Sequence, residues 1–187
     1  ANLKGQILEA TDQPVHIIAH SQGGLDSRYM ISHLDMAKQV RSLTTIATPH
    51  RGSPVADWTI SKTQKIGVFK MLEWSTMDTQ AFMDLRTAEC EEFNHKTPNV
   101  DSVKYFSVAG EPKREEMLTP LRALHDIVSE TEGPNDGLVS TQSATWGEET
   151  IIWPADHAQQ IGWFNDPSFD WRNGWNEILG KLTAMEK

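Results

Sequence analysis

One short segment, Ala19-His20-Ser21-Gln22-Gly23-Gly24, constrains the fold of this chain more than any other. It follows the run at 15–19, whose β-branched and apolar residues are typical of a buried strand. It precedes the stretch at 25–34, whose apolar residues share one helical face. A serine between a strand and a helix sits on a sharp turn, and the start of the helix beside it favours negative charge. We therefore predict that Ser21 is an exposed nucleophile.

The neighbours of the serine fit such a turn. Ala19 and Gly23, two positions before and two after it, are small enough for the strand and the helix to approach each other. The backbone N–H of Gln22 is predicted to donate to an oxyanion at the same place. The alternative interpretation is an ordinary strand, turn and helix with a surface serine.

Further strands and helices alternate along the chain. Strands are expected at 43–47, 103–109 and 150–153, each short and rich in β-branched or aromatic residues. Helices are expected at 3–10, from a cap at Asp78 to about Phe93, at 118–128 and at 176–185. This order predicts an α/β protein with a mostly parallel, doubly wound sheet, whose sites lie at the carboxyl ends of the strands.

A serine nucleophile needs a histidine to take its proton. Seven histidines are present, and His157 is the best candidate, because it follows the last expected strand in a loop. His50 also follows a strand, but no orienting acid follows from its position. The other five lie on expected strands or helices or adjoin the serine: His16, His20, His33, His95 and His125.

The histidine in turn needs a carboxylate that orients it. Asp136 lies 21 residues before His157, in an Asn-Asp-Gly turn where Gly137 gives the backbone freedom to present a side chain. A plain turn is the alternative interpretation of this segment. Asp126 falls in an expected helix, and Asp156 adjoins the histidine and could only be a secondary partner. A metal hydrolase that uses Asp136, Asp156 and His157 is a weaker alternative, because the spacing does not suit metal ligands.

Composition narrows the function further. The formal charge of −9 argues against nucleic-acid binding, which needs a basic surface. The single cysteine, Cys90, excludes an internal disulfide, favours a reducing compartment and is expected to be a buried side chain on a helix. No signal peptide and no run of 18 apolar residues is visible.

Three motifs taken together resemble the triacylglycerol lipase family of α/β-hydrolases. They lie at 19–29 (AHSQGGLDSRY), 47–53 (ATPHRGS) and 135–140 (NDGLVS), and they are similar to those of Pseudomonas-type lipases and of fungal, mitochondrial-type triacylglycerol lipases. The resemblance implies acylglycerol substrates, transient contact with a lipid surface, no cofactor and, for fungal relatives, a mitochondrial location. It also implies Ser21, Asp136 and His157 as nucleophile, acid and base, with Gln22 as an oxyanion donor. The bacterial relatives bind calcium through an aspartate where this chain has Gln159, so no calcium is expected.

The resemblance also concerns the extent of the domain. Relatives supply a first oxyanion donor from a His-Gly loop that comes before the nucleophile, and several strands precede it. We therefore expect residues 1–187 to be one hydrolase domain that lacks its N-terminal strands and is weakly active alone. The apolar segment 54–77, together with 111–130, is expected to form a cap or lid over Ser21. The alternative interpretation is that these apolar residues are the core of an inserted helical layer.

Two other functions remain open at this point. An acyltransferase or thioesterase of the same fold would use the same residues, with a different acceptor or acyl group. A catalytically inactive fragment that acts as a binding module is the second, and labelling of Ser21 by a fluorophosphonate would distinguish it.

Overall fold

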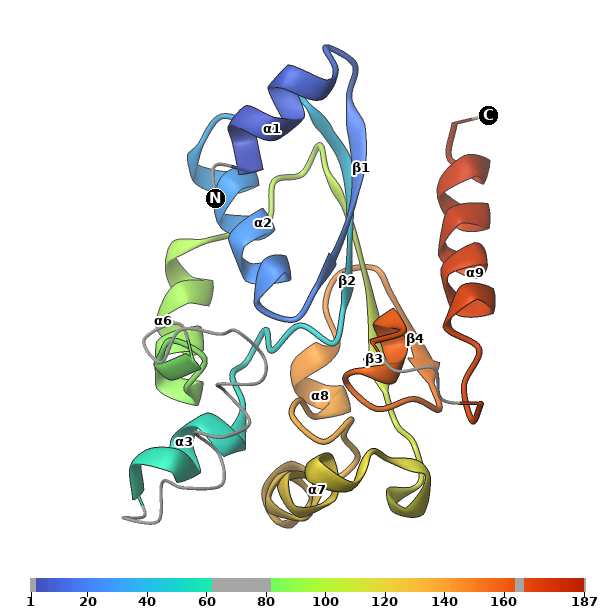
Figure 1. Cartoon of the computed structure of the whole chain (residues 1–187). Helices are drawn as coiled ribbons and strands as arrows, with labels where there is room; N and C mark the ends of the chain where they lie inside the picture. Colours follow the sequence, from blue (N-terminus) through green and yellow to red (C-terminus); the bar gives the residue numbers. More distant parts are fainter. Residues whose placement is uncertain (1–2, 62–81, 164–166, 187) are drawn as a thin grey trace.

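A computed structural model of the chain describes residues 3–61, 82–163 and 167–186. Its centre is a parallel sheet whose strands are hydrogen-bonded in the order β1-β2-β3-β4 (Figure 1). The strands are β1 (Val15–His20), β2 (Val40–Ile46), β3 (Lys104–Gly110) and β4 (Glu149–Trp153). All four run in the same direction, so their carboxyl ends meet at one edge, where the expected site residues lie.

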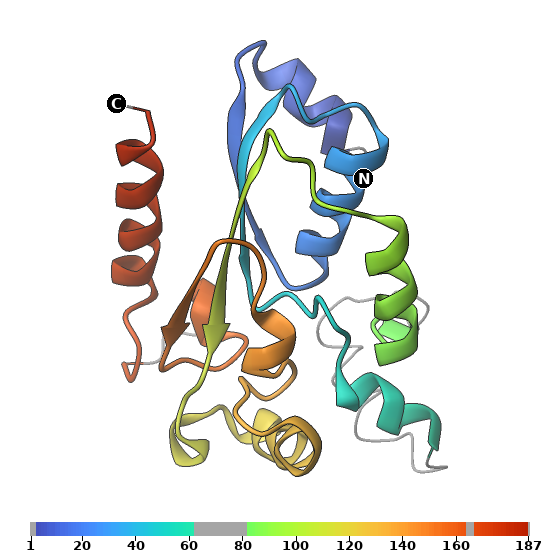
Figure 2. The same cartoon turned by 180° about the vertical axis from the view of Figure 1, so that it is seen from behind.

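Helices cover both faces of this sheet, as Figures 1 and 2 show from opposite sides. Helices α1 and α2 lie on one face and α9 lies on the other. The fold class expected from the sequence, an α/β protein with a parallel sheet between helices, is confirmed. None of the helices in the described ranges is long and apolar enough to cross a membrane. The remaining bounds are α1 (Leu3–Ala10), α2 (Gln22–His33), α3 (Pro54–Ser61), α6 (Thr87–Lys96), η1 (Arg114–Glu116), α7 (Thr119–Glu132), α8 (Thr141–Ala144), η2 (Gln159–Ile161) and α9 (Trp171–Ala184).

Successive side chains of each strand point to opposite faces of the sheet. Ile17, Leu43 and Tyr105 pack in the cluster under α1 and α2. Ile46 and Val108 pack on the opposite face with Ile178 and Leu182 of α9, which form a second cluster. Because a strand's side chains alternate between its faces, β2, which lies between β1 and β3 with helices over both faces, is buried on both sides except at Arg41.

A third apolar cluster lies beyond the carboxyl ends of the strands, where α3, α6 and α7 meet (Figure 1). Val55 and Val128 are fully buried in it. Two segments were expected to form a lid, 54–77 and 111–130. The described part of the first, 54–61, belongs to α3 and packs in this cluster, and the second contains η1 and most of α7. Residues 62–77 lie outside the described residues. The lid stays a prediction.

Two expected helices differ from the observed ones. The helix expected from Asp78 to about Phe93 is not continuous, because residues 84–86 form a turn and a bend and α6 begins only at Thr87. Asp78 itself lies outside the described residues, so its part as a cap stays a prediction. The Asp57 carboxylate of α3 accepts from the Thr87 backbone N–H and hydroxyl, so the cap comes from another helix. The last helix begins at Trp171 instead of residue 176, because Asp170 caps it by accepting from Arg172 N at 3.1 Å.

Candidate active site

Ser21 lies on the turn between β1 and α2 with φ 54° and ψ −134°. A positive φ is strained for a residue with a side chain, and three hydrogen bonds hold it there. Its N–H donates to Ile46 O at 2.9 Å, and its carbonyl accepts from Gly24 N at 3.0 Å and from Thr48 Oγ1 at 2.7 Å. The sharp turn expected from the sequence is confirmed.

Close packing around this turn depends on Gly24. A Cβ on Gly24 would lie 2.2 Å from Thr48 Oγ1 and 2.8 Å from Thr45 Cγ2, so no larger residue fits without a shift. A Cβ on Gly23 would lie an ordinary 4.0 Å from Ala19 Cβ. The sequence interpretation assigned the close approach to Ala19 and Gly23, and the structure places the tighter restriction one residue later.

A chain of hydrogen bonds joins three side chains that are far apart in the sequence. His157 Nε2 lies 3.1 Å from Ser21 Oγ, and His157 Nδ1 lies 2.9 Å from Asp136 Oδ2. Asp136 is fully buried and His157 is 6% exposed, whereas Ser21 is only partly buried. Because a carboxylate can only accept, Nδ1 carries the proton and Nε2 is free to accept from the serine hydroxyl. The structure thus brings together all three residues selected from the sequence.

Asp136 is fixed by its own turn. Its Oδ1 accepts from Leu138 N at 3.0 Å and from Val139 N at 2.8 Å, while Gly137 adopts φ 100° to allow this turn. The backbone carbonyl of Asp136 accepts from His157 N at 3.0 Å. The backbones of the two loops are therefore joined, as well as the two side chains.

Asp156 holds the loop that carries His157. Its Oδ1 accepts from Ala158 N at 3.0 Å and Gln159 N at 2.9 Å, and its Oδ2 accepts from Leu118 N at 2.8 Å. Burial raises the pKa of this carboxyl group, and the three backbone donors oppose that rise. Asp156 is thus bonded to backbone groups, not to the His157 ring, and it ties this loop to the segment that precedes α7.

Residues 6–162 match the PGAP1-like alpha/beta domain family. The chain belongs to this family. Among its relatives, triacylglycerol lipase 2 of Saccharomyces cerevisiae is 36% identical over 179 residues, which cover 92% of this chain and 52% of that protein. A triacylglycerol lipase of Pseudarthrobacter phenanthrenivorans is 39% identical over 114 residues, 50% of this chain and 35% of that protein. The chain thus spans about half the length of the yeast relative and about a third of the length of the bacterial one.

Solved structures give the fold of this PGAP1-like domain. The mature Bacillus licheniformis lipase BlEst2 superposes with a TM-score of 0.70 at 23% identity, over 83% of this chain and 64% of that chain. The Staphylococcus hyicus lipase also gives a TM-score of 0.70, at 20% identity, over 92% of this chain and 70% of that chain. The PGAP1-like domain therefore has the α/β-hydrolase fold that its motifs indicated.

His50, the second histidine considered from the sequence, lies elsewhere in the PGAP1-like domain. Its Nε2 lies 3.0 Å from Thr45 Oγ1, and its Nδ1 accepts from Arg28 Nη1 at 3.2 Å. Burial and then the neighbouring arginines keep its pKa well below the usual range. His50 is therefore a neutral, buried residue that packs flat against Trp146, with ring centroids 4.9 Å apart.

Two residues of the site were missed in the sequence. His20 was set aside because it adjoins the serine, yet its ring lies against that of His157, with centroids 4.6 Å apart. Gln160 was not considered, yet its Nε2 donates to Asp136 Oδ2 at 3.1 Å. The only available signal was proximity to Ser21 and His157 in the sequence, which does not tell where a side chain points.

Gln159 stands where the bacterial relatives were expected to have a calcium-binding aspartate. Its Oε1 accepts from Asp156 N at 2.7 Å, and its Nε2 donates to Glu116 O at 3.1 Å and Ser168 Oγ at 3.0 Å. A neutral amide thus joins three backbone and side-chain groups there. In the described part of the chain, no group of three or more His, Cys, Asp or Glu side chains is placed to hold a metal ion.

Proposed function

We propose that the protein hydrolyses carboxylic esters through an acyl-enzyme on Ser21, with acylglycerols as its substrate class. The observation that carries this proposal is the hydrogen-bonded chain from Ser21 Oγ through His157 to Asp136, with distances of 3.1 and 2.9 Å. The triacylglycerol lipases among the relatives support the substrate class. Transient contact with a lipid surface is part of the same proposal.

Proton transfer follows from the roles of the two nitrogens of His157. Nε2 takes the proton of Ser21 as Oγ attacks the ester carbonyl carbon. The imidazolium that forms is stabilised by the Asp136 carboxylate and then gives its proton to the leaving alcohol. Water next attacks the acyl-serine and loses a proton to Nε2, and the imidazolium then gives that proton to Ser21 Oγ as the acyl–Oγ bond breaks and the acid leaves.

The oxyanion of each tetrahedral intermediate needs a donor beside Ser21. Gln22 is the first residue of α2, so its N–H is among those that a helix leaves without an acceptor in its own backbone. We assign it as an oxyanion donor, assisted by the positive end of the helix dipole.

The test compares the intact protein with its Ser21→Ala variant. The wild type is expected to hydrolyse a soluble nitrophenyl ester and emulsified triacylglycerol, and to be labelled by a fluorophosphonate at Ser21. Ser21→Ala should lose about 10⁴-fold or more in kcat, because no hydroxyl attacks. Ser102→Ala changes an exposed serine near the start of β3 and serves as the control. Hydrolysis that survives in Ser21→Ala, or a label on another residue, would overturn the assignment.

A further inference from the structure

Gln160 is buried completely, next to the acid of the site. Its Nε2 donates to Asp136 Oδ2 at 3.1 Å, the same oxygen that accepts from His157 Nδ1 at 2.9 Å. The opposite orientation of the amide would set Oε1 against that carboxylate oxygen, two acceptors without a proton between them. The donor side of Gln160 therefore faces Asp136.

The other half of this amide is not satisfied. Among the residues that the structure describes, no donor reaches Gln160 Oε1, although the atom is buried. A buried acceptor without a partner lowers the stability of the folded protein, and an apolar side chain of similar size would avoid that loss. The amide at this position is therefore poorly explained by stability alone.

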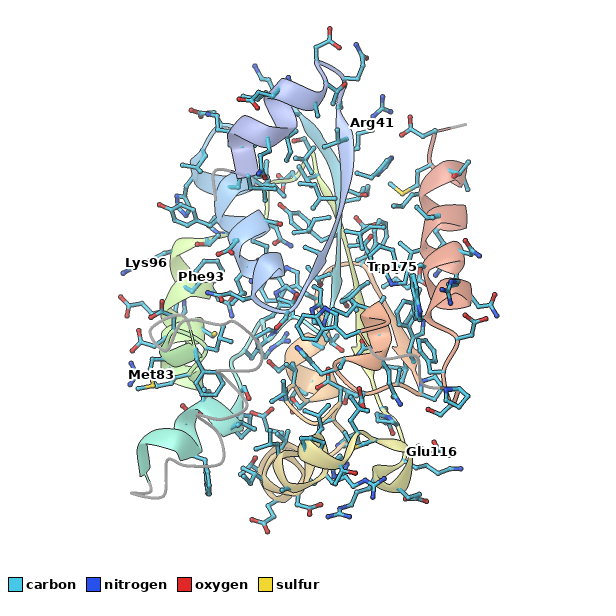
Figure 3. The ribbon with its side chains drawn as sticks, viewed as in Figure 1. Arg41, Met83, Phe93, Lys96, Glu116 and Trp175 are labelled. Carbon is cyan, nitrogen blue, oxygen red and sulfur yellow. The ribbon has the colours of Figure 1, made fainter. Side chains whose placement is uncertain are left out.

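The surrounding fold is shaped to admit this amide. A Cβ on Gly110, at the end of β3, would lie 2.4 Å from Gln160 Nε2 and 2.7 Å from Asp136 Cβ. On the other side, Gln160 O accepts from Trp175 Nε1 at 3.0 Å, and Trp175 of α9 is labelled in Figure 3. Strand β3 thus leaves the space, and α9 fixes the backbone.

We infer that Gln160 is a positioning residue that orients the Asp136 carboxylate toward His157, an inference that rests on the proposed ester hydrolysis. Together with Leu138 N and Val139 N on Oδ1, it completes four donors around one carboxylate. A carboxylate held on both oxygens cannot rotate away from His157. The hydrogen bond from Gln160 partly neutralises the negative charge on Oδ2. It therefore limits how strongly Asp136 stabilises the protonated imidazole of His157.

The test uses the intact protein with Gln160→Met, which keeps the length of the side chain and removes the donor, and Gln160→Glu, which adds an acid. Without the donor, more of the charge on Oδ2 acts on His157. The acid limb of the profile of kcat/KM against pH should then move up by about 0.5 to 1 pH unit in Gln160→Met, and further in Gln160→Glu. We also expect kcat to fall about tenfold in Gln160→Met with little change in KM, because the base is less well oriented.

Gln159→Met is the matched control, since Gln159 is an adjacent buried glutamine that contacts Asp156, Glu116 and Ser168. It should weaken the loop, while the acid limb keeps the wild-type position. An acid limb at the same pH in both Gln160 variants as in Gln159→Met would overturn the inference.

A second measurement separates this inference from the proposed function. NMR of protein with isotope-labelled histidine follows the titration of the His157 ring, assigned with His157→Gln, without any substrate. If the wild type neither hydrolyses esters nor reacts with a fluorophosphonate, the proposed function fails. A displaced His157 titration in Gln160→Met would still support the orienting contact, and an unchanged titration in both Gln160 variants would refute it.

Discussion

His20 Nε2 donates a hydrogen bond of 3.0 Å to the backbone carbonyl of His157, a residue 137 positions later in the chain. The two rings lie side by side, with centroids 4.6 Å apart. Burial, and then the charge of His157, lower the pKa of His20 from 6.5 to about 3. His20 is therefore a neutral donor over most of the pH scale, and it supports the loop that carries His157 without adding a charge beside Ser21.

The lowered pKa of His20 has a consequence for stability. As pH falls from about 6.5 toward 3, the unfolded chain binds a proton at this histidine before the folded protein does, so the free energy of unfolding decreases. His20→Gln keeps a donor and removes this titration. Urea denaturation at about pH 7.5, 5.5 and 4.5 measures the free energy of unfolding of both proteins. We expect the free energy of unfolding to decrease less in His20→Gln than in the wild type as pH falls. His95→Gln, at an exposed histidine, is the control, and two parallel curves for His20→Gln would contradict the assignment.

Asp156→Asn should destabilise the folded protein by about 2 to 4 kcal/mol, because an amide cannot accept on both sides from the three backbone N–H groups that surround the carboxylate. Urea denaturation measures the loss. Asp170→Asn is the control, because asparagine caps a helix as well as aspartate does, and we expect a change below about 0.5 kcal/mol at the start of α9. Equal losses in the two variants would show that Asp156 has no special part in the loop.

Gly52 and Gly133 allow a steric effect to be separated from backbone strain. Both adopt a positive φ, 85° and 83°, but a Cβ on Gly52 would lie 2.6 Å from the Thr87 backbone, whereas a Cβ on Gly133 would meet nothing within 4 Å. Gly133 has ψ −131°, a combination that residues with a side chain rarely adopt, so Gly133→Ala should cost about 1 to 3 kcal/mol from strain alone. Gly52→Ala should cost at least about 2 kcal/mol more, since α6 must move. Similar melting temperatures for the two variants would show that α3 and α6 are packed less closely there.

The thiol of Cys90 is expected to be unreactive in the folded protein. It is fully buried in α6, and burial raises its pKa to about 12, so almost no thiolate forms near neutral pH. Ellman's reagent should react with less than about a tenth of the thiol in the native protein within an hour, and fully after denaturation. Rapid reaction of the native protein would mean that the cluster of α3, α6 and α7 opens readily.

Local sequence signals were sufficient for most elements. The β-branched runs of β1 and β3 and the apolar face of α7 were predicted to within a few residues, because strand and helix periods are visible in any short window. The start of α6 was not predictable in this way. Its cap is Asp57, 30 positions earlier in the chain, and no local window contains both partners.

Some residues of the candidate site were likewise predictable from local sequence, and others were not. Ser21, Asp136 and His157 could be selected from their turns, their order and their places after strands. His20 and Gln160 could not, since a residue next to a selected one can point toward it or away from it.

By itself, the sequence determined most of the strands and helices, and it selected three side chains as candidates for nucleophile, base and acid. Those properties depend on residue type and on spacing within a few positions. Only the tertiary structure decided that these side chains meet, and that His20, Asp156 and Gln160 hold two of them in place. A hydrogen bond needs its two heavy atoms within about 3 Å of each other. His157 lies more than 100 positions after Ser21 and His20, so only the packing of the sheet and its helices sets those distances.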